Sequence, residues 1–209
     1  MKLKRILLPL FFCITHLVFA QSAYRIEGQI KGLSGGSCIL ANYYAAQIYA
    51  KDTAQADKNG HFVIEGTKPL AGGVYEIVLP DRKTLYRMLI ADDQDFSFTA
   101  DTVDIVGSMR VKGSRDNELF YEFQRFMKEK ETEYQKLKAQ KVPDSDKRYK
   151  DIQDQRKAFY DNFMKVNEGT FTVKLFKASA EPELPAAPKL PNGKTDSAWV
   201  FNYYKNHYW

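Results

Sequence analysis

The residues able to do redox or nucleophilic chemistry are few and widely spaced. The chain has two cysteines, Cys13 and Cys38, and no C-x-x-C motif. Disulfide exchange needs an attacking and a resolving thiol, so this pattern argues against a dithiol enzyme. Cys38 stands beside Ile39 and Leu40 with no base near it in the sequence. This setting favours a buried thiol that packs as a small apolar side chain over a reactive one.

Histidines and carboxylates could bind a metal, but their spacing matches no recognised site. His61 and His207 are far apart in the chain and do not form a ligand pair by spacing. An acidic run offers hard oxygen ligands and comprises Asp92, Asp93 and Asp95. It lacks the ligand ladder and the distal glutamate of a calcium loop, so a solvated turn is the simpler interpretation.

A second pattern resembles half of a calcium loop and consists of Asp57, Asn59 and Gly60. A hairpin turn explains the same residues fully. No nucleophile can be paired with a base from the sequence. We therefore predict that the chain is not an enzyme, that it has no catalytic, cofactor-binding or metal-binding residue, and that it uses no cofactor.

Residues 1–20 have the pattern of a cleavable signal peptide. Three basic residues, Lys2, Lys4 and Arg5, precede a mostly apolar stretch over residues 6–19. A membrane anchor needs roughly 20 unbroken apolar residues, and this stretch is interrupted by polar ones. We predict cleavage after Ala20 and export of a secreted protein to the periplasm or cell envelope, with no transmembrane segment.

Lipidation of Cys13 is the alternative outcome of export. A lipid-modified cysteine usually follows small residues, whereas bulky Leu10, Phe11 and Phe12 precede Cys13. Cleavage as an ordinary signal peptide is therefore preferred.

The charge of the chain argues against nucleic acid as a partner. The net charge of +5 includes three positive charges within residues 1–20, so the mature chain carries about +2. Nucleic-acid binding calls for a basic domain with a clustered face. Cleavage also leaves Cys38 as the single cysteine, so the mature fold must be held by its core and not by an internal disulfide.

Residues 22–113 show the period-two alternation of β-strands. In the first segment, Tyr24, Ile26 and Ile30 alternate with polar residues. Strands are predicted at 24–30, 38–44, 47–53, 61–65, 74–79, 85–90, 96–99, 103–106 and 109–112. The turn residues at 57–60 predict a hairpin. Many short strands at this spacing indicate an antiparallel β-sandwich or open barrel, in a mainly β plus α protein.

Residues 114–180 change to a period of about 3.6, which predicts helices. Ser114 or Asp116 can cap a first helix that runs toward Lys141, and a second is predicted over 146–166 with a short one over 171–178. The two long helices carry apolar stripes: Leu119, Phe123, Phe126 and Met127, then Tyr149, Ile152, Phe159, Tyr160 and Phe163. We expect the stripes to pack on each other as a helical hairpin, with docking of a partner helix as the alternative.

The C-terminal part separates into a linker and an aromatic end. Residues 181–198 contain four prolines and predict an extended linker. The segment 199–209 is rich in aromatic side chains: Trp199, Phe201, Tyr203, Tyr204, Tyr208 and Trp209. Such a segment needs a surface to bury against. We predict that it begins a further region or meets a partner, with folding back onto the hairpin or sandwich as the alternative.

Several strand and turn motifs carry a family resemblance. They are Y-x-I-x-G-x-I-x-G over 24–32, the turn at 57–62 with Gly66, the helix start at Gly113-Ser114 with Asn117 and Leu119, and the aromatic run 201–209. Together these motifs resemble the N-terminal domain of unknown function that precedes thioredoxin-like domains, of the AhpC/TSA or thiol-disulfide oxidoreductase type, in Bacteroidetes envelope proteins. The redox domain itself has no counterpart in this sequence.

The resemblance implies an envelope location and association with thiol redox proteins. We expect a non-catalytic module that packs with, positions or binds a thioredoxin-like partner domain or protein. The alternative is an independent ligand-binding β-sandwich, in which strand edges or loops such as Gly66–Gly73 hold a carbohydrate or peptide. Clustered exposed aromatic side chains on the β-domain would favour that alternative. The sequence does not indicate the oligomeric state.

Overall fold

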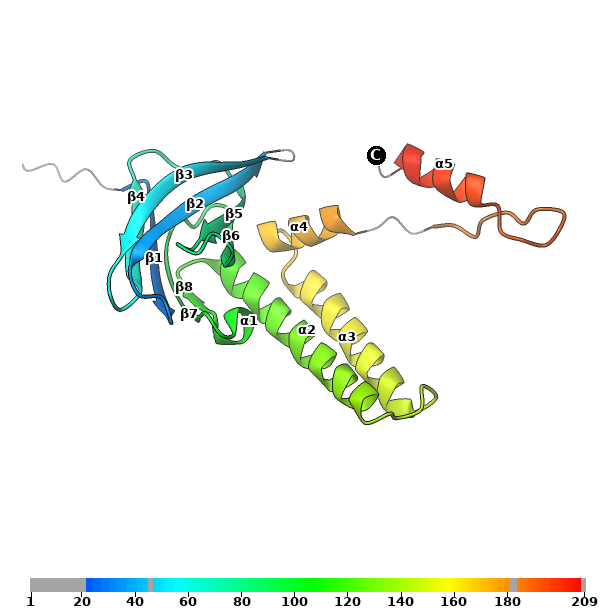
Figure 1. Ribbon diagram of the computed structural model, residues 1–209. Coiled ribbons are helices and arrows are strands. Elements are labelled where there is room, and N and C mark those ends of the chain that lie inside the picture. The colour runs from blue at the N-terminus through cyan, green and yellow to red at the C-terminus, as the bar shows by residue number, and fades with distance from the viewer. Residues whose placement is uncertain (1–21, 45–46, 181–183, 208–209) are drawn as a thin grey trace, which may run out of the picture.

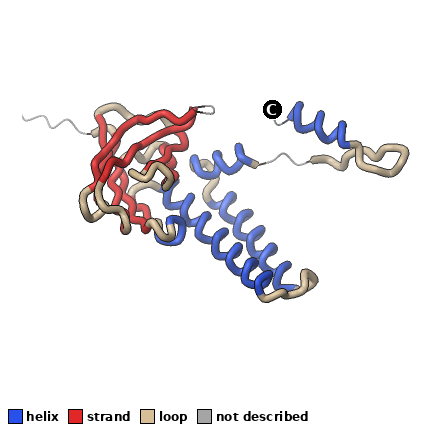
Figure 2. Tube along the Cα trace, viewed as in Figure 1, coloured by secondary structure: helices blue, strands red, loops and turns tan. Residues whose placement is uncertain are grey.

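The protein has a β-sandwich at its N-terminal side, followed by helices (Figures 1 and 2). The computed structural model describes residues 22–44, 47–180 and 184–207. Within these ranges the strands are β1 (Tyr24–Lys31), β2 (Gly36–Tyr44), β3 (Gln47–Ala56), β4 (His61–Gly66), β5 (Gly73–Val78), β6 (Leu85–Ile90), β7 (Asp95–Asp101) and β8 (Arg110–Lys112). They form two separate sheets, in the orders β4-β1-β7-β8 and β3-β2-β5-β6. The predicted sandwich is confirmed, and the described strands do not close into a barrel.

The alternation predicted for the first strand places its apolar side chains in the core. Tyr24, Ile26 and Ile30 are buried in β1, and the residues between them are less covered. Gly28 lies in the same inward row. A Cβ atom there would lie 2.4 Å from the Phe62 ring, so only glycine fits beneath that ring.

Two details of the strands differ from the prediction. β1 and β7 pair in parallel, whereas the other strand pairs are antiparallel. The predicted strand at 103–106 is wrong, because this part of the chain enters helix α1 (Ile105–Ser108). The Asp104 side chain accepts a hydrogen bond from the Gly107 N–H and caps that helix. A short apolar run does not distinguish a strand from a helical turn by periodicity.

The predicted hairpin at 57–60 is wrong in its pairing, although its turn chemistry is present. Asp57 accepts hydrogen bonds from the N–H groups of Asn59 at 2.7 Å and His61 at 3.0 Å, and Gly60 has a φ of 80°. The strands on either side then part, because β3 pairs with β2 and β4 pairs with β1 in the other sheet. The turn therefore carries the chain from one sheet to the other.

Helices follow the sandwich, and each long one starts at a capping side chain. They are α2 (Arg115–Ala139), α3 (Lys147–Val166), α4 (Phe171–Ser179) and α5 (Ser197–His207). Ser114, Asp146 and Thr170 accept hydrogen bonds from the first turns of α2, α3 and α4. None of the described helices combines the length and apolar character that crossing a membrane requires. The predicted signal peptide and Cys13 lie outside the described residues.

The helices α2 and α3 pack on each other as an antiparallel hairpin that projects from the sandwich (Figure 1). The Phe126 and Phe159 rings stack with centroids 3.8 Å apart. Nearer the tip, the Tyr134 and Tyr149 rings are in contact with centroids 5.2 Å apart. The predicted hairpin is thus present, and its two stripes face each other. We call this hairpin, residues 115–166, the arm.

The base of the arm is bonded to the edge of the second sheet. The Asn117 side chain pairs with Leu89 in edge strand β6, accepting from its N–H at 2.8 Å and donating to its carbonyl at 2.7 Å. Tyr121 donates to the Arg87 carbonyl at 2.7 Å. These side chains satisfy backbone groups that an edge strand otherwise leaves open. They hold the first turns of α2 against the sheet.

The helix α4 packs back against the same base. The Thr172 hydroxyl donates to the Asp116 carboxylate at 2.8 Å, and the Thr172 N–H donates to it at 2.7 Å. Phe171, Leu175 and Phe176 pack against the core of the sandwich. The sandwich, the base of the arm and α4 therefore share one continuous apolar core.

Candidate functional site

Cys38 lies between the two sheets, as predicted for a packing residue. It has no exposed surface in β2, beside the equally buried Leu40. Burial raises the pKa of the Cys38 thiol to about 11. The thiolate, which is the reactive form, is therefore disfavoured and shielded from solvent.

The two histidines of the predicted mature chain lie on different elements, β4 and α5, which are apart in Figure 1. The His61 Nε2 atom lies 2.9 Å from Glu27 Oε1, and Arg25 donates to the other oxygen of Glu27 at 2.7 Å. The hydrogen bond with His61, followed by that with Arg25, lowers the pKa of Glu27. His207 stacks on Tyr203 with centroids 4.1 Å apart. The structure does not bring the two histidines together.

The acidic run is part of the connection into the arm. The Asp93 carboxylate accepts a hydrogen bond from the Arg115 N–H at 3.0 Å, at the start of α2. Asp95 begins β7, and Asp92 precedes Asp93 in the turn. Among the residues that the structure describes, no group of three His, Cys, Asp or Glu side chains is placed to hold a metal ion. The Asp57 carboxylate accepts hydrogen bonds from backbone N–H groups and so serves the turn instead of a metal ion.

The loop 66–73 is fastened to the sandwich. The Gln94 side chain accepts from the Leu70 N–H at 2.8 Å and donates to the Leu70 carbonyl at 3.0 Å. Leu70 itself packs against the core. The loop is therefore a closed edge of the domain, which does not favour its use as an adaptable ligand-binding loop.

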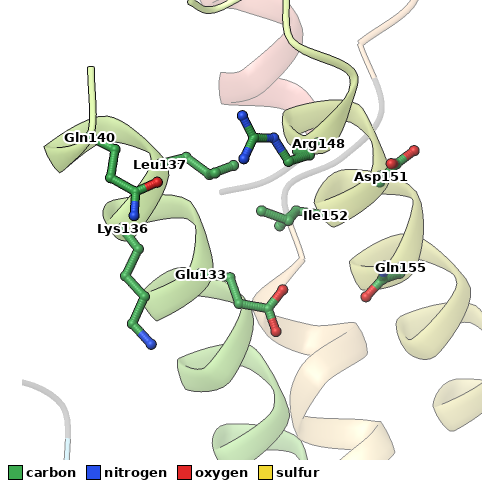
Figure 3. A pocket seen from close by; sticks show the side chains of 8 residues that line it. All are labelled: Glu133, Lys136, Leu137, Gln140, Arg148, Asp151, Ile152 and Gln155. Carbon is green, nitrogen blue, oxygen red and sulfur yellow. The ribbon is translucent and has the colours of Figure 1, made fainter. Parts of the chain in front are cut away.

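A groove of about 410 Å³ lies near the tip of the arm, between α2 and α3 (Figure 3). Leu137 and Ile152 provide apolar surface in it, and both are almost fully buried. The remaining lining side chains are polar or charged: Glu133, Lys136, Gln140, Arg148, Asp151 and Gln155. We call it the arm groove. Side chains of both charge signs therefore surround a small apolar floor.

A second hollow, of about 330 Å³, lies at the seam between β6, α1 and α2. Its apolar lining is Leu85, Ile105, Val106, Phe120 and Tyr121, and its polar lining is Glu76, Arg87 and Gln124. Glu76 is 3% exposed, and its Oε1 atom accepts a hydrogen bond from Arg87 Nε at 2.9 Å and forms an ion pair with Nη2 at 2.8 Å. We call it the seam pocket. The sequence feature that could have indicated this pocket is Glu76, an acidic residue within the otherwise apolar strand β5.

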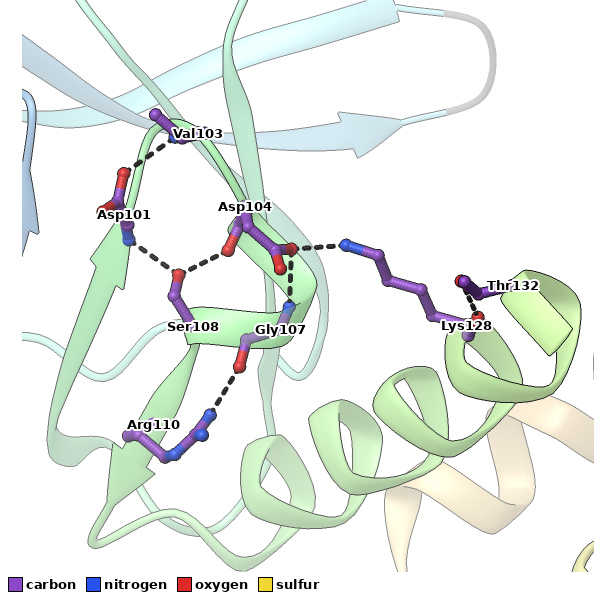
Figure 4. Close-up of polar contacts among 8 residues, drawn as sticks. All are labelled: Asp101, Val103, Asp104, Gly107, Ser108, Arg110, Lys128 and Thr132. Atoms are coloured by element: carbon purple, nitrogen blue, oxygen red, sulfur yellow. Dashed lines mark hydrogen bonds and ion pairs between the residues drawn. The ribbon is translucent and has the colours of Figure 1, made fainter. Parts of the chain in front are cut away.

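Helix α1 forms one wall of the seam pocket and is fixed by polar contacts (Figure 4). The Asp101 N–H donates to Ser108 Oγ at 2.8 Å, and Arg110 donates to the Gly107 carbonyl at 2.8 Å. Asp104 forms an ion pair with Lys128 of α2, and that pair and the Gly107 N–H hydrogen bond lower the Asp104 pKa. The wall is thus tied both to the first sheet and to the arm.

The aromatic segment forms α5, whose described residues include no buried side chain. Trp199, Tyr203 and His207 stack in a row along it, with centroids 5.3 Å and 4.1 Å apart. Phe201 is 68% exposed. In Figure 1 the helix stands clear of the sandwich and the arm. The prediction that another surface covers this segment remains a prediction.

Residues 24–120 match the model of a protein family described as Domain of unknown function (DUF4369). The match covers the sandwich and the first turns of α2, up to Phe120. It supports the predicted resemblance to a domain of unknown function. No curated protein and no solved structure matches the chain significantly.

Proposed function

We propose that the chain is a non-catalytic, exported module of the cell envelope that positions a thioredoxin-like thiol-disulfide oxidoreductase. The resemblance to the domain that precedes such enzymes in Bacteroidetes motivates the choice of partner. Burial of Cys38 supports the division of labour, because a shielded thiol with a raised pKa is a poor nucleophile. In this proposal the partner performs the thiol chemistry.

The observation that carries the proposal is the anchored, projecting arm. Its base is fixed by the side chains of Asn117 and Tyr121 on β6 and by Thr172 of α4. Its tip carries the arm groove, far from the sandwich (Figures 1 and 3). Because the base of the arm is fixed to the sandwich, a protein bound at the tip is held in a defined position relative to the sandwich. Positioning of this kind reduces the orientational cost of association.

Binding by a purified thioredoxin-like oxidoreductase of the same envelope tests the proposal, measured by isothermal titration calorimetry. The rim variant Lys136→Glu/Asp151→Lys reverses two charges of the arm groove and keeps the net charge. The matched control Lys157→Asp/Asp161→Lys swaps an exposed i,i+4 ion pair of α3. We expect the rim variant to bind about 10-fold more weakly and the control to bind like the original chain. Absence of binding, or equal binding by both variants, contradicts the proposal.

The ligand-binding sandwich is supported less well. Large apolar side chains exposed on the described β-domain are Ile48, Tyr49, Leu85 and Val103, of which Tyr49 is the one aromatic. Carbohydrate and peptide sites of sandwiches rely on clustered aromatic side chains. The loop 66–73 is also closed by Gln94.

Export is part of the proposal and has its own measurement. We expect the exported protein to begin at Gln21, after cleavage behind Ala20, because residues 1–20 combine a basic start with an apolar stretch. Intact-mass spectrometry of the exported protein reads the cleavage site directly. A species that retains Cys13 with added acyl mass contradicts a free secreted module and supports a lipid anchor.

A further inference from the structure

We propose that α5 closes over the seam pocket of its own chain, with one of its aromatic side chains inserted beside Arg87 and Glu76. The inference concerns a contact within the chain and does not depend on the identity of the oxidoreductase partner. It assigns a surface to the aromatic segment and an occupant to the seam pocket.

The chemistry of the seam pocket suits an aromatic side chain that also donates a hydrogen bond. Arg87 is 51% exposed, and Glu76 Oε1 holds its guanidinium in place through a hydrogen bond from Nε and an ion-pair contact with Nη2. A fixed guanidinium attracts the face of an aromatic ring. No hydrogen bond from a described residue reaches the other oxygen, Glu76 Oε2, so it can accept one from an incoming group. An indole N–H or a phenol O–H entering this pocket can donate to that oxygen.

The walls of the pocket supply the apolar contact. Leu85, Ile105, Val106 and Phe120 surround the Arg87–Glu76 pair. Leu85 is 38% exposed on its strand, so part of this apolar surface faces solvent. The Gln124 amide makes no hydrogen bond with another described residue and lines the same pocket. Apolar walls with a few fixed polar groups are the usual composition of a binding pocket.

Helix α5 carries the matching groups. Trp199 and Tyr203 are four residues apart and lie on one face, where their rings stack at 5.3 Å. Phe201 is 68% exposed on the same helix. Exposed aromatic surface of this extent favours burial against another apolar surface. The arm groove is a poorer acceptor, because its rim is made mostly of charged and amide side chains that do not select aromatic rings.

The connection between α4 and α5 permits this contact. Phe176, near the end of α4, lies against Phe120, a wall of the seam pocket, with ring centroids 6.2 Å apart. Phe176 lies three residues before Ser179, the last residue of α4, after which the connection to α5 begins. The bridge between Lys189 and Thr195 closes part of it into a turn. The residues of the connection outside this turn span ~40 Å when extended. This length exceeds the radius of gyration of a domain of ~100 residues, which is ~13 Å, so the connection is long enough for α5 to reach another face of the domain.

Tryptophan fluorescence tests the closure, because the chain has only two tryptophans, Trp199 and Trp209. In a full-length Trp209→Phe background, the emission reports on α5 alone. We expect the emission maximum to lie to the blue of the urea-unfolded chain, and acrylamide quenching to be weaker than in the unfolded chain. Both readings should be independent of protein concentration, because the contact is within one chain.

Two pocket variants and one control complete the test. Leu85→Glu on β6 and Gln124→Glu on α2 each place a charge in the lining of the pocket, from two different elements. Each should shift Trp199 emission to the red and increase quenching, whereas Val103→Glu, at a side chain 92% exposed outside the pocket, should change neither. Circular dichroism checks that the variants are folded. Fully exposed emission in the parent chain, no response to either folded pocket variant, or a concentration-dependent shift that indicates contact between copies would overturn the proposal.

Discussion

Cys38 shows how burial of a single side chain decides its chemistry. The residue has no exposed surface, and burial raises its thiol pKa to about 11 from an ordinary value of 9.0. A rise of about 2 pKa units lowers the thiolate fraction at pH 8 by about 100-fold. The sequence predicted this correctly, because a cysteine within an alternating apolar strand points into the core.

We expect Cys38 to resist thiol reagents in the folded chain at pH 8. Labelling of the exported, mature protein with Ellman's reagent should be slow without urea and complete within the mixing time in denaturing urea, because only unfolding exposes the thiol. The urea-treated sample is the matched control for thiol content. Rapid stoichiometric labelling of the native protein contradicts the buried position.

Asn117 is the residue whose structural role the sequence did not reveal. In the sequence it appeared as one member of a helix-start motif, whereas in the structure its amide closes the edge of β6. Glu76 was missed for the same reason, since its partner Arg87 is supplied by a neighbouring strand. Both roles depend on contacts between elements, and no local pattern in one sequence encodes them.

Replacing Asn117 by leucine should lower the free energy of unfolding by about 2–4 kcal/mol. The change keeps the side-chain size but leaves the buried N–H and carbonyl of Leu89 without partners. Gln135→Leu, on the exposed face of α2, should change it by less than about 0.5 kcal/mol. Urea titrations followed by circular dichroism measure both. Equal stabilities for the two variants would show that Asn117 does not fasten the arm.

At the level of elements, the outcome of each prediction follows from what periodicity encodes. Period-two alternation located the strands of both sheets, and the change to a period of about 3.6 located α2, α3 and α4. Periodicity does not encode which strand lies beside which, so the parallel pairing of β1 with β7 and the crossing of the chain between sheets after β3 were not predicted. The four-residue helix α1 was too short for its period to be recognised.

The arm divides into a base that belongs to the sandwich and a tip that does not. Leu137, Tyr149 and Ile152 form a small cluster of their own near the tip. Phe120 and Tyr121, at the base, belong to the core of the sandwich. The two parts should therefore respond differently to mutation.

Replacing residues 131–154 with a four-residue Gly/Asn turn should shorten the arm and leave cooperative thermal unfolding in place. The deletion keeps the Phe126–Phe159 stack and every contact of the base. Phe176→Ala in α4 is the contrasting variant, because that ring packs against Phe120, Phe123 and Phe163. It should cost about 2 kcal/mol or more. Loss of cooperative unfolding in the shortened chain would mean that the tip supports the sandwich.

At the scale of the whole molecule, the structure combines a shielded thiol, a fixed arm and an aromatic helix on a tether. The family match covers residues 24–120, which include the sandwich and the base of the arm, while the arm tip, α4 and α5 lie beyond it. In the proposed function, a partner performs the thiol chemistry and this chain positions that partner.

Reduction of insulin disulfides by the purified mature chain measures directly whether this chain carries out thiol chemistry itself. With dithiothreitol as electron donor, we expect the original chain and Cys38→Ser both to give the uncatalysed rate of insulin precipitation, because the single thiol is buried and has no resolving cysteine. An authentic thioredoxin in the same assay confirms that turnover is detectable. Catalytic precipitation by the original chain that disappears in Cys38→Ser would show that this chain is itself a thiol oxidoreductase.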